Sequence, residues 1–154
     1  MNEEIRYRIA AKDDIDTLMS IRLEMLHIVN ELPEDYSFTD ELMECSRQYF
    51  LEGSQTTVIA LAGDKAVACA SISYIDIMPT FSHPTGKRAH LMNVYTKAEY
   101  RRNGISRKLV QMLIDEAVKR GVTEISLDAT RMGRPLYQSL GFRDSDECMV
   151  LKLT

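Results

Sequence analysis

Four basic side chains surround one glycine where a strand pattern changes into a helix pattern. They are Arg101, Arg102, Arg107 and Lys108, and the glycine is Gly104. The first amides of a helix have no partner within it, and the peptide dipoles place about half a positive charge there. Glycine also lets a ligand approach the backbone closely. This pattern predicts a site for a phosphate or pyrophosphate. A solvated loop that caps a core helix is the alternative, because one glycine in a basic turn is a weak signal.

Two periodic segments must position this turn. Residues 89–96 are typical of a strand, and the apolar residues after the turn recur at helical spacing. We expect Gly121 to end that helix and residues 122–129 to form the next strand, with Ile125 and Leu127 facing inward. The sequence therefore predicts a strand, a basic turn, a helix and a second strand in succession.

The remaining segments predict further elements around this unit. We expect a strand over 5–10, a helix from about 12 to 29, a second helix over 39–51, strands over 56–62 and 66–77, a loop over 78–87, a short helix over 134–140 and a last strand over 148–153 that closes the sheet. Their order is β-α-α-β-β-β-α-β-α-β. No repeat or linker interrupts it, so we expect a single domain over residues 1–154.

Two motifs resemble hallmarks of the GCN5-related N-acetyltransferases (GNAT). Residues 101–106 (Arg-Arg-Asn-Gly-Ile-Ser) resemble the Q/R-x-x-G-x-G/A signature, whose backbone amides hold the pyrophosphate of acetyl-CoA in that family. Residues 136–142 (Leu-Tyr-Gln-Ser-Leu-Gly-Phe) resemble its L-Y-E-x-L-G-F segment. The resemblance implies an α/β (α+β) fold with a mixed, mostly antiparallel central sheet and helices on both faces. It also implies a gap between the strands at 89–96 and 122–129 for the pantetheine arm.

The same resemblance implies a cosubstrate and a reaction. Acetyl-CoA would be held by Val94, Tyr95, Thr96, Arg101, Arg102, Asn103, Gly104, Ile105, Ser106, Arg107, Thr130 and Tyr137. The chain would be an acyltransferase that moves the acetyl group to a primary amine of a small molecule or peptide. The amine would attack directly in a ternary complex, with a backbone N–H of residues 94–96 stabilising the oxyanion. A non-catalytic acyl-CoA-binding sensor or scaffold of the same fold is the alternative.

Candidate acid and base residues differ in how well the sequence identifies them. Tyr137 matches the tyrosine that commonly protonates the leaving thiolate; a ring that only packs beneath the sheet is the alternative. His90 is the candidate base on the central strand. A structural histidine and a water relay are alternatives, and Glu24, Glu31 and His83 are further candidates.

Three positions depart from the family pattern or from ordinary amphipathic spacing. Ser106 occupies the last glycine or alanine position of the signature, so its hydroxyl either bonds a phosphate oxygen or crowds it. Thr130 stands where an asparagine often contacts the cofactor, and its hydroxyl is the expected replacement. Arg22 lies on the apolar face of the first helix. We interpret its stem as packed, with the guanidinium reaching solvent or a carboxylate; substrate binding is the alternative.

Composition and charge argue against several classes of protein. The 154 residues are 45% hydrophobic, with a formal net charge of −4, so a nucleic-acid-binding surface is not expected. No apolar run approaches membrane-spanning length, and residues 1–6 are too polar for a signal peptide. Three widely spaced cysteines and three scattered histidines predict neither a disulfide framework nor a metal site. We expect a cytoplasmic protein without a metal, and the family resemblance suggests a homodimer.

Overall fold

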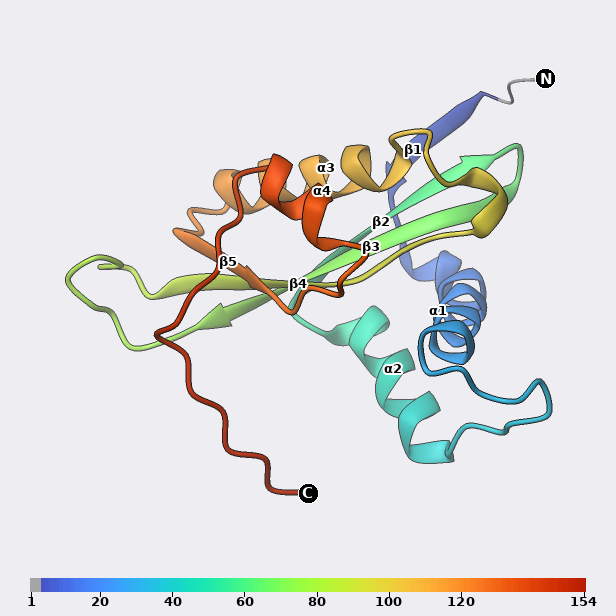
Figure 1. The fold of residues 1–154 in the computed structure, drawn as a ribbon, viewed down its shortest axis with the longest axis horizontal. Helices are drawn as coiled ribbons and strands as arrows, with labels where there is room; N and C mark the ends of the chain where they lie inside the picture. The colour runs from blue at the N-terminus through green and yellow to red at the C-terminus, as the bar shows by residue number, and fades with distance from the viewer. Residues whose placement is uncertain (1–3) are drawn as a thin grey trace.

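A five-stranded sheet forms the centre of the molecule, in a computed structural model that describes residues 4–154 (Figure 1). Residues 1–3, part of the polar start considered above, lie outside the described residues. In chain order the strands are β1 (Ile5–Ile9), β2 (Gln55–Ala62), β3 (Lys65–Asp76), β4 (Lys87–Thr96) and β5 (Glu124–Leu127), and the helices are α1 (Ile15–Val29), α2 (Asp40–Glu52), α3 (Ile105–Lys119) and α4 (Arg134–Ser139), with short 3-10 turns at Lys12–Asp14 and Ala98–Tyr100.

Helices cover both faces of this sheet, which confirms the expected fold class. Figure 1 shows α3 and α4 on one face and α1 and α2 on the other. Strands β1 to β4 pair antiparallel in sequence order, and β5 joins β4 in parallel. Leu109 and Leu113 of α3 are fully buried in one core cluster, and Leu18 and Ile21 of α1 are buried in a second. The basic turn therefore lies at the start of a helix that packs firmly on the sheet.

Strand β4 departs from regular pairing in two ways. Tyr95 lies opposite Cys69 and Met92 opposite Ser71, so β4 carries one more residue than β3 between these pairs. This β-bulge contains Asn93, whose φ is +59°. On its other side β4 pairs with β5 only through residues 88–91, so the register ends where Leu91 lies opposite Leu127. Beyond that point β4 has no strand neighbour toward β5.

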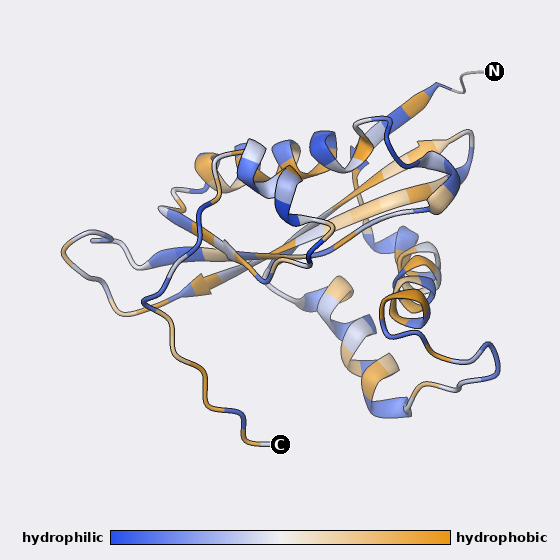
Figure 2. Ribbon diagram, in the orientation of Figure 1, coloured by the Kyte–Doolittle hydropathy of each residue, from blue (hydrophilic) through white to orange (hydrophobic). Residues whose placement is uncertain are grey.

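The predicted last strand, over residues 148–153, is wrong. The chain after Phe142 forms no strand, and Met149, Val150, Leu151 and Leu153 are exposed. Figures 1 and 2 show this segment as an apolar tail that runs away from the sheet to the C-terminus. Alternating apolar residues favour a strand, but a strand also needs a neighbour that accepts its backbone hydrogen bonds. Within residues 4–154 the tail is not paired with any strand of the sheet.

Candidate functional site

The basic turn, residues 101–104, has the backbone of an anion site. Arg102 has φ +65° and Gly104 has φ +73°, and α3 begins directly after this glycine. A Cβ added at Gly104 would meet no atom within 4 Å, so open space lies in front of the backbone. The first helical bond of α3 runs from the Lys108 N–H to the Gly104 oxygen, 3.1 Å away. The amides of residues 105–107 precede that bond, so they are the ones that a ligand can use.

Side chains of the basic turn hold the backbone in place. Ser106 shares a 2.6 Å hydrogen bond with the Thr96 hydroxyl, so the structure favours neither expectation for Ser106. The Arg101 Nε donates to the Thr96 carbonyl at 3.0 Å. The Asn103 amide donates to two carbonyl oxygens of the turn, at 3.0 and 3.2 Å. These bonds tie the start of α3 to the end of β4 and leave the backbone amides as the ligand-facing groups.

The other side chains that were predicted to bind the cofactor differ in whether they already have hydrogen-bond partners. Arg107 donates to Ser139 of α4 at 2.5 Å. The Thr130 hydroxyl accepts the Gly133 N–H at 3.1 Å, so it already holds the turn that begins α4. Arg102 makes no hydrogen bond or ion pair with residues 4–154, and it is the cation of the basic turn that can move toward an anion.

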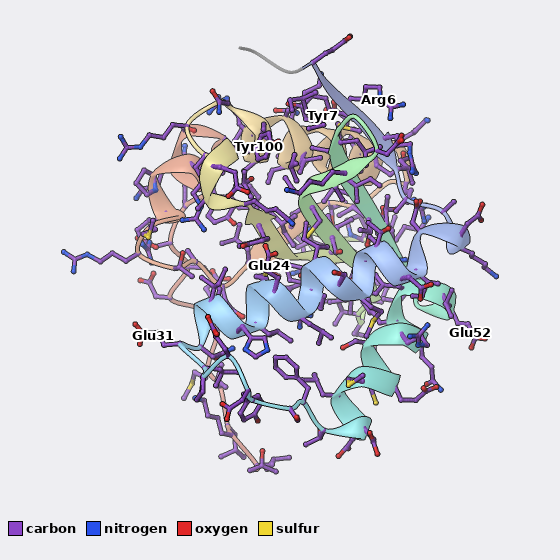
Figure 3. The ribbon with its side chains drawn as sticks, turned by 90° about the vertical axis from the view of Figure 1, so that its right-hand side faces the viewer. Arg6, Tyr7, Glu24, Glu31, Glu52 and Tyr100 are labelled. Carbon is purple, nitrogen blue, oxygen red and sulfur yellow. The ribbon has the colours of Figure 1, made fainter. Side chains whose placement is uncertain are left out.

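Tyr95 joins the end of β4 to α1. Its hydroxyl donates to the Glu24 carboxylate at 2.7 Å, and Lys97 lies 3.3 Å from the other carboxylate oxygen. Burial and the bond to Glu24 raise the pKa of Tyr95 well above its ordinary value. Figure 3 shows Glu24 midway along α1. Glu24, considered above as a base, is therefore already engaged by two partners, and neighbouring Val94 is half-buried against the core of the α3 face.

Tyr137 lines a groove of about 770 Å³ along the outer edge of β5, here called the β5 groove. Its half-buried ring lies 5.9 Å from the Phe142 ring, centroid to centroid. Burial raises the pKa of Tyr137 above its ordinary value, so the hydroxyl keeps its proton at neutral pH. That hydroxyl has no hydrogen-bond partner in the described part of the chain. It can therefore donate to a ligand in the groove.

His90 lines the same groove from the opposite face of the sheet. Ala89 and Leu91 point into the α3 core, so alternation along β4 turns His90 the other way. Its Nδ1 lies 2.8 Å from the Ser126 hydroxyl, and its Nε2 lies 3.6 Å from the Asp128 carboxylate. The structure brings His90 and Tyr137 to one groove without bringing them into contact.

The remaining candidate bases lie elsewhere. His83 is held in the loop before β4 by Thr123, at 2.8 Å, with Glu124 3.5 Å away. Glu31 follows the end of α1 as an exposed residue with φ +51°. Neither side chain lines the β5 groove.

A second pocket, of about 200 Å³, lies between α1, α2 and β4, and is here called the Arg22 pocket. It is lined by Arg22, Cys45, Ser46, Tyr49, Phe50, Met92 and Asn93. The Arg22 guanidinium was expected to reach solvent or a carboxylate; no carboxylate partner is found among residues 4–154, and the guanidinium donates to the Asn93 side-chain oxygen at 3.2 Å. Sequence reasoning did not predict a pocket here; its one signal was Arg22 on an apolar helix face, for which substrate binding was the alternative.

Other kinds of site find little support in the described residues. No group of three or more histidine, cysteine, aspartate or glutamate side chains within residues 4–154 could hold a metal ion. No helix in the same range is long and apolar enough to cross a membrane. Cys69 is fully buried, and burial raises the pKa of its thiol to about 12. A thiol held in this way is a poor nucleophile.

Comparison with known proteins finds acetyltransferases among the proteins that are similar to this chain. A structure described as a predicted acetyltransferase with acetyl-CoA, from Clostridium acetobutylicum, is 33% identical with a TM-score of 0.85, and the match covers 97% of each chain. Human N-acetyltransferase 8 is 26% identical over 116 residues, 73% of this chain and 49% of that protein. Bovine thialysine N-epsilon-acetyltransferase is 23% identical over 135 residues, 80% of this chain and 79% of that protein.

The extent of these matches also matters. The chain spans about half the length of N-acetyltransferase 8 and of the Bacillus subtilis N-acetyltransferase YsnE. The family model covers residues 22–142, which include both motifs, the bulge of β4 and its separation from β5. On this match and on the agreement of the fold, the chain belongs to the acetyltransferase (GNAT) family.

Proposed function

We propose that the chain, as one domain over residues 1–154, transfers the acetyl group of acetyl-CoA to a primary amine of a small molecule or peptide. One observation carries this proposal: the pairing of β4 with β5 ends at Leu91, and the free end of β4 at Thr96 is bonded to the basic turn with its open backbone. A long, thin cosubstrate with an anionic end fits such an arrangement. Family membership and the relative with acetyl-CoA support the identity of that cosubstrate.

The basic turn would hold the anionic part of acetyl-CoA, which supplies the acetyl group as a thioester. Three amides of α3 and the free Arg102 supply the hydrogen bonds and the charge. Arg101, Asn103 and Ser106 act indirectly, because their side chains fix the turn. Arg107 and Thr130 act in the same way, since each already bonds within or near α4.

Two groups of β4 and α4 would assist the reaction. Val94, at the bulge, has no register partner in β3 or β5, and its backbone N–H would stabilise negative charge on the thioester oxygen; such a donor is worth about 100- to 1,000-fold in rate. Tyr137 would give its proton to the departing thiolate, a contribution of about 100- to 10,000-fold. His90, with Ser126 and Asp128 beside it, would accept the proton of the amine.

Direct attack in a ternary complex fits these residues better than an acyl-enzyme. An acyl-enzyme needs a nucleophile next to the thioester. Cys69 is the cysteine nearest the bulge, and its thiol donates to the Asn93 carbonyl at 3.4 Å. Its raised pKa keeps it protonated at neutral pH. The amine of the acceptor is therefore the nucleophile in this proposal.

An acceptor screen tests the proposal. Purified protein and acetyl-CoA are incubated with pooled amines, amino acids, polyamines, aminoglycosides and short peptides, and mass spectrometry detects products heavier by one acetyl group. We expect at least one pool to be acetylated, and a control without acceptor measures hydrolysis. Binding of acetyl-CoA without any acetylated product would overturn the proposed enzymatic activity in favour of a non-catalytic acyl-CoA-binding module.

We propose further that two copies of the chain form a homodimer by exchanging C-terminal tails. The outer edge of β5 has no strand partner within residues 4–154, and the β5 groove runs along it. Met149, Leu151 and Leu153 are 83 to 94% exposed in the tail. A tail from a second copy would complete the edge and bury these side chains, and the exchange is reciprocal in a two-fold dimer.

The molar mass in solution tests the exchange. Met149→Glu with Leu151→Glu should give a monomer by gel filtration with light scattering, because buried carboxylates disfavour the paired tail. Met78→Glu with Phe81→Glu, in a loop where both side chains are equally exposed, should stay dimeric like the unmodified chain. A monomeric unmodified chain would refute the exchange.

A further inference from the structure

Arg22 is a half-buried cation without a counter-ion in the described part of the chain. The one hydrogen bond that its side chain makes there runs from Nη1 to the Asn93 amide oxygen, at 3.2 Å. A guanidinium has five N–H donors, so most of this group is left for other partners. Burial lowers the pKa of Arg22, which shows that its surroundings penalise the charge. A counter-ion at Arg22 would offset this cost.

The free donors of Arg22 face space rather than packed protein. Among residues 4–154, no Arg22 nitrogen is both cut off from solvent and without a hydrogen-bond partner. The side chain lines the Arg22 pocket, whose walls include the rings of Tyr49 and Phe50. Tyr49 directs its hydroxyl to Ser73 at 2.8 Å, so it does not compete for the guanidinium. The pocket therefore presents a positive, bidentate donor between aromatic walls.

The pocket also adjoins the place where the reaction would occur. Asn93, which accepts from Arg22, immediately precedes Val94, and its own amide donates to Ser71 at 3.4 Å. A ligand group on Arg22 thus lies close to the bulge. At about 200 Å³ the pocket is smaller than the 300 Å³ or more that is usual for drug-sized ligands, so it suits a small molecule or the end of a larger one.

We propose that the acceptor is an amine that carries a free carboxylate, such as an amino acid, and that Arg22 binds this carboxylate. A planar carboxylate matches the guanidinium fork, and pairing removes the cost of the uncompensated charge. With the carboxylate on Arg22, the amine of the same small molecule is within reach of the bulge. This inference rests on the proposed function and names the class of acceptor for that site.

Matched compounds test the inference. The twenty common L-amino acids and thialysine are compared with the corresponding amides and decarboxylated amines, and O-phosphoethanolamine represents phosphorylated amines. The unmodified chain should use at least one free amino acid at least about tenfold better in kcat/KM than its amide, as expected for a charged hydrogen-bonded pair. Arg22→Gln should remove that preference by lowering kcat/KM for the amino acid and not for the amide.

Control variants separate recognition from structure. Arg22→Lys should keep part of the preference, because it keeps the charge but not the fork. Arg47→Gln, on α2 and 3.9 Å from Asp16, should leave both substrates unchanged. Equal use of the amino acid and its amide, an equal loss of both in Arg22→Gln, or a preference for O-phosphoethanolamine would overturn the inference.

A binding measurement distinguishes the failure of this inference from the failure of the proposed function. If no compound of this set or of the acceptor screen is acetylated, the proposed function fails, and calorimetry with the CoA-loaded protein then decides the inference alone. Binding of an amino acid but not of its amide, lost in Arg22→Gln, would still support a carboxylate site. No difference between these compounds would overturn it.

Discussion

The basic turn and the Arg22 pocket flank the same strand but are built in different ways. The turn presents backbone amides, and its geometry comes from consecutive residues with two positive φ values. The Arg22 pocket presents side chains that α1, α2 and β4 bring together. A site made of backbone keeps its ligand when most side chains change. A site made of side chains from three elements changes its ligand with a single substitution.

The largest expected effect concerns the basic turn. Gly104→Glu places a bulky negative side chain in the open space before the amides, so the Kd of acetyl-CoA should rise at least about 100-fold by calorimetry, a cost of about 2.7 kcal/mol. Gly63→Glu is a matched control, because Gly63 has φ +61° and also no atom within 4 Å of an added Cβ. It carries the same backbone strain at the β2–β3 turn. Equal affinity in the two variants would show that the pyrophosphate binds elsewhere.

A smaller effect is expected for the acid. Tyr137→Phe should lower kcat at least about tenfold, because the thiolate then leaves without a proton donor, while the Kd of acetyl-CoA stays unchanged. Tyr7→Phe, whose ring packs against the same core cluster, serves as control. Steady-state kinetics with the acceptor found in the screen measures the difference. Unchanged kcat would remove Tyr137 from the mechanism and would leave the backbone as the main contributor on this side of the strand.

A change in the Arg22 pocket should weaken the binding of the acceptor and leave that of acetyl-CoA unchanged, the reverse of the effect expected at the basic turn. Asn93→Gly keeps the positive φ of the bulge at no steric cost but removes the amide that orients Arg22. The acceptor KM should rise about three- to tenfold, the equivalent of about one hydrogen bond, with the Kd of acetyl-CoA unchanged. A rise in both constants would mean that the two sites are not independent.

The smallest expected effect lies at the junction between the two sites, where Tyr95 bonds Glu24. Because the pKa of Tyr95 is raised in the folded chain, the unfolded chain loses this proton first as the pH rises. Below about pH 10 Tyr95 should therefore add no pH dependence to the free energy of unfolding, because it is protonated in both states; above that pH the free energy of unfolding should fall. Tyr95→Phe should cost about 1 kcal/mol at neutral pH and flatten that fall.

Urea unfolding at about pH 8 and about pH 10.5 measures both effects, on either side of the ordinary tyrosine pKa. Tyr74→Phe is a control, since Tyr74 bonds the neutral Thr56 hydroxyl rather than a carboxylate. An equal fall in stability with pH for the unmodified chain and Tyr95→Phe would contradict the assignment.

The sequence predicts those features that depend only on residues close together in the chain. The strand at 89–96, the glycine at 104 and the helix that follows are local patterns, and they were found with boundaries shifted by a few residues at most. The family resemblance added the expectation of a gap between β4 and β5, and the structure shows that their pairing ends at Leu91. Thr130 and Ser106 were recognised as departures from the motif, but their partners, Gly133 and Thr96, were not foreseen.

Contacts between distant residues could not be predicted in the same way. Glu24 and Tyr95 are 71 positions apart, as are Arg22 and Asn93. These pairs depend on how α1 lies across β4, which no local pattern encodes. The wrong prediction for the tail has a related cause. Residues 148–153 have strand-forming side chains, but a strand also needs a partner strand, and this segment is paired with none within residues 4–154.

The bulge in β4 also determines which parts of this strand can change in length. Leu91 faces the α3 core and so does Val94, three residues later, whereas a regular strand would turn them to opposite faces. The bulge absorbs the extra residue, so the alternation resumes with Tyr95 toward Glu24 and Thr96 toward Ser106. Deleting Asn93 would leave a regular strand that keeps both contacts, because Val94 would then follow Met92 directly, but it would remove the side chain that accepts from Arg22. This strand can therefore lose one residue at the bulge and still serve both faces, whereas the loss of a second residue between Leu91 and Thr96 would reverse them.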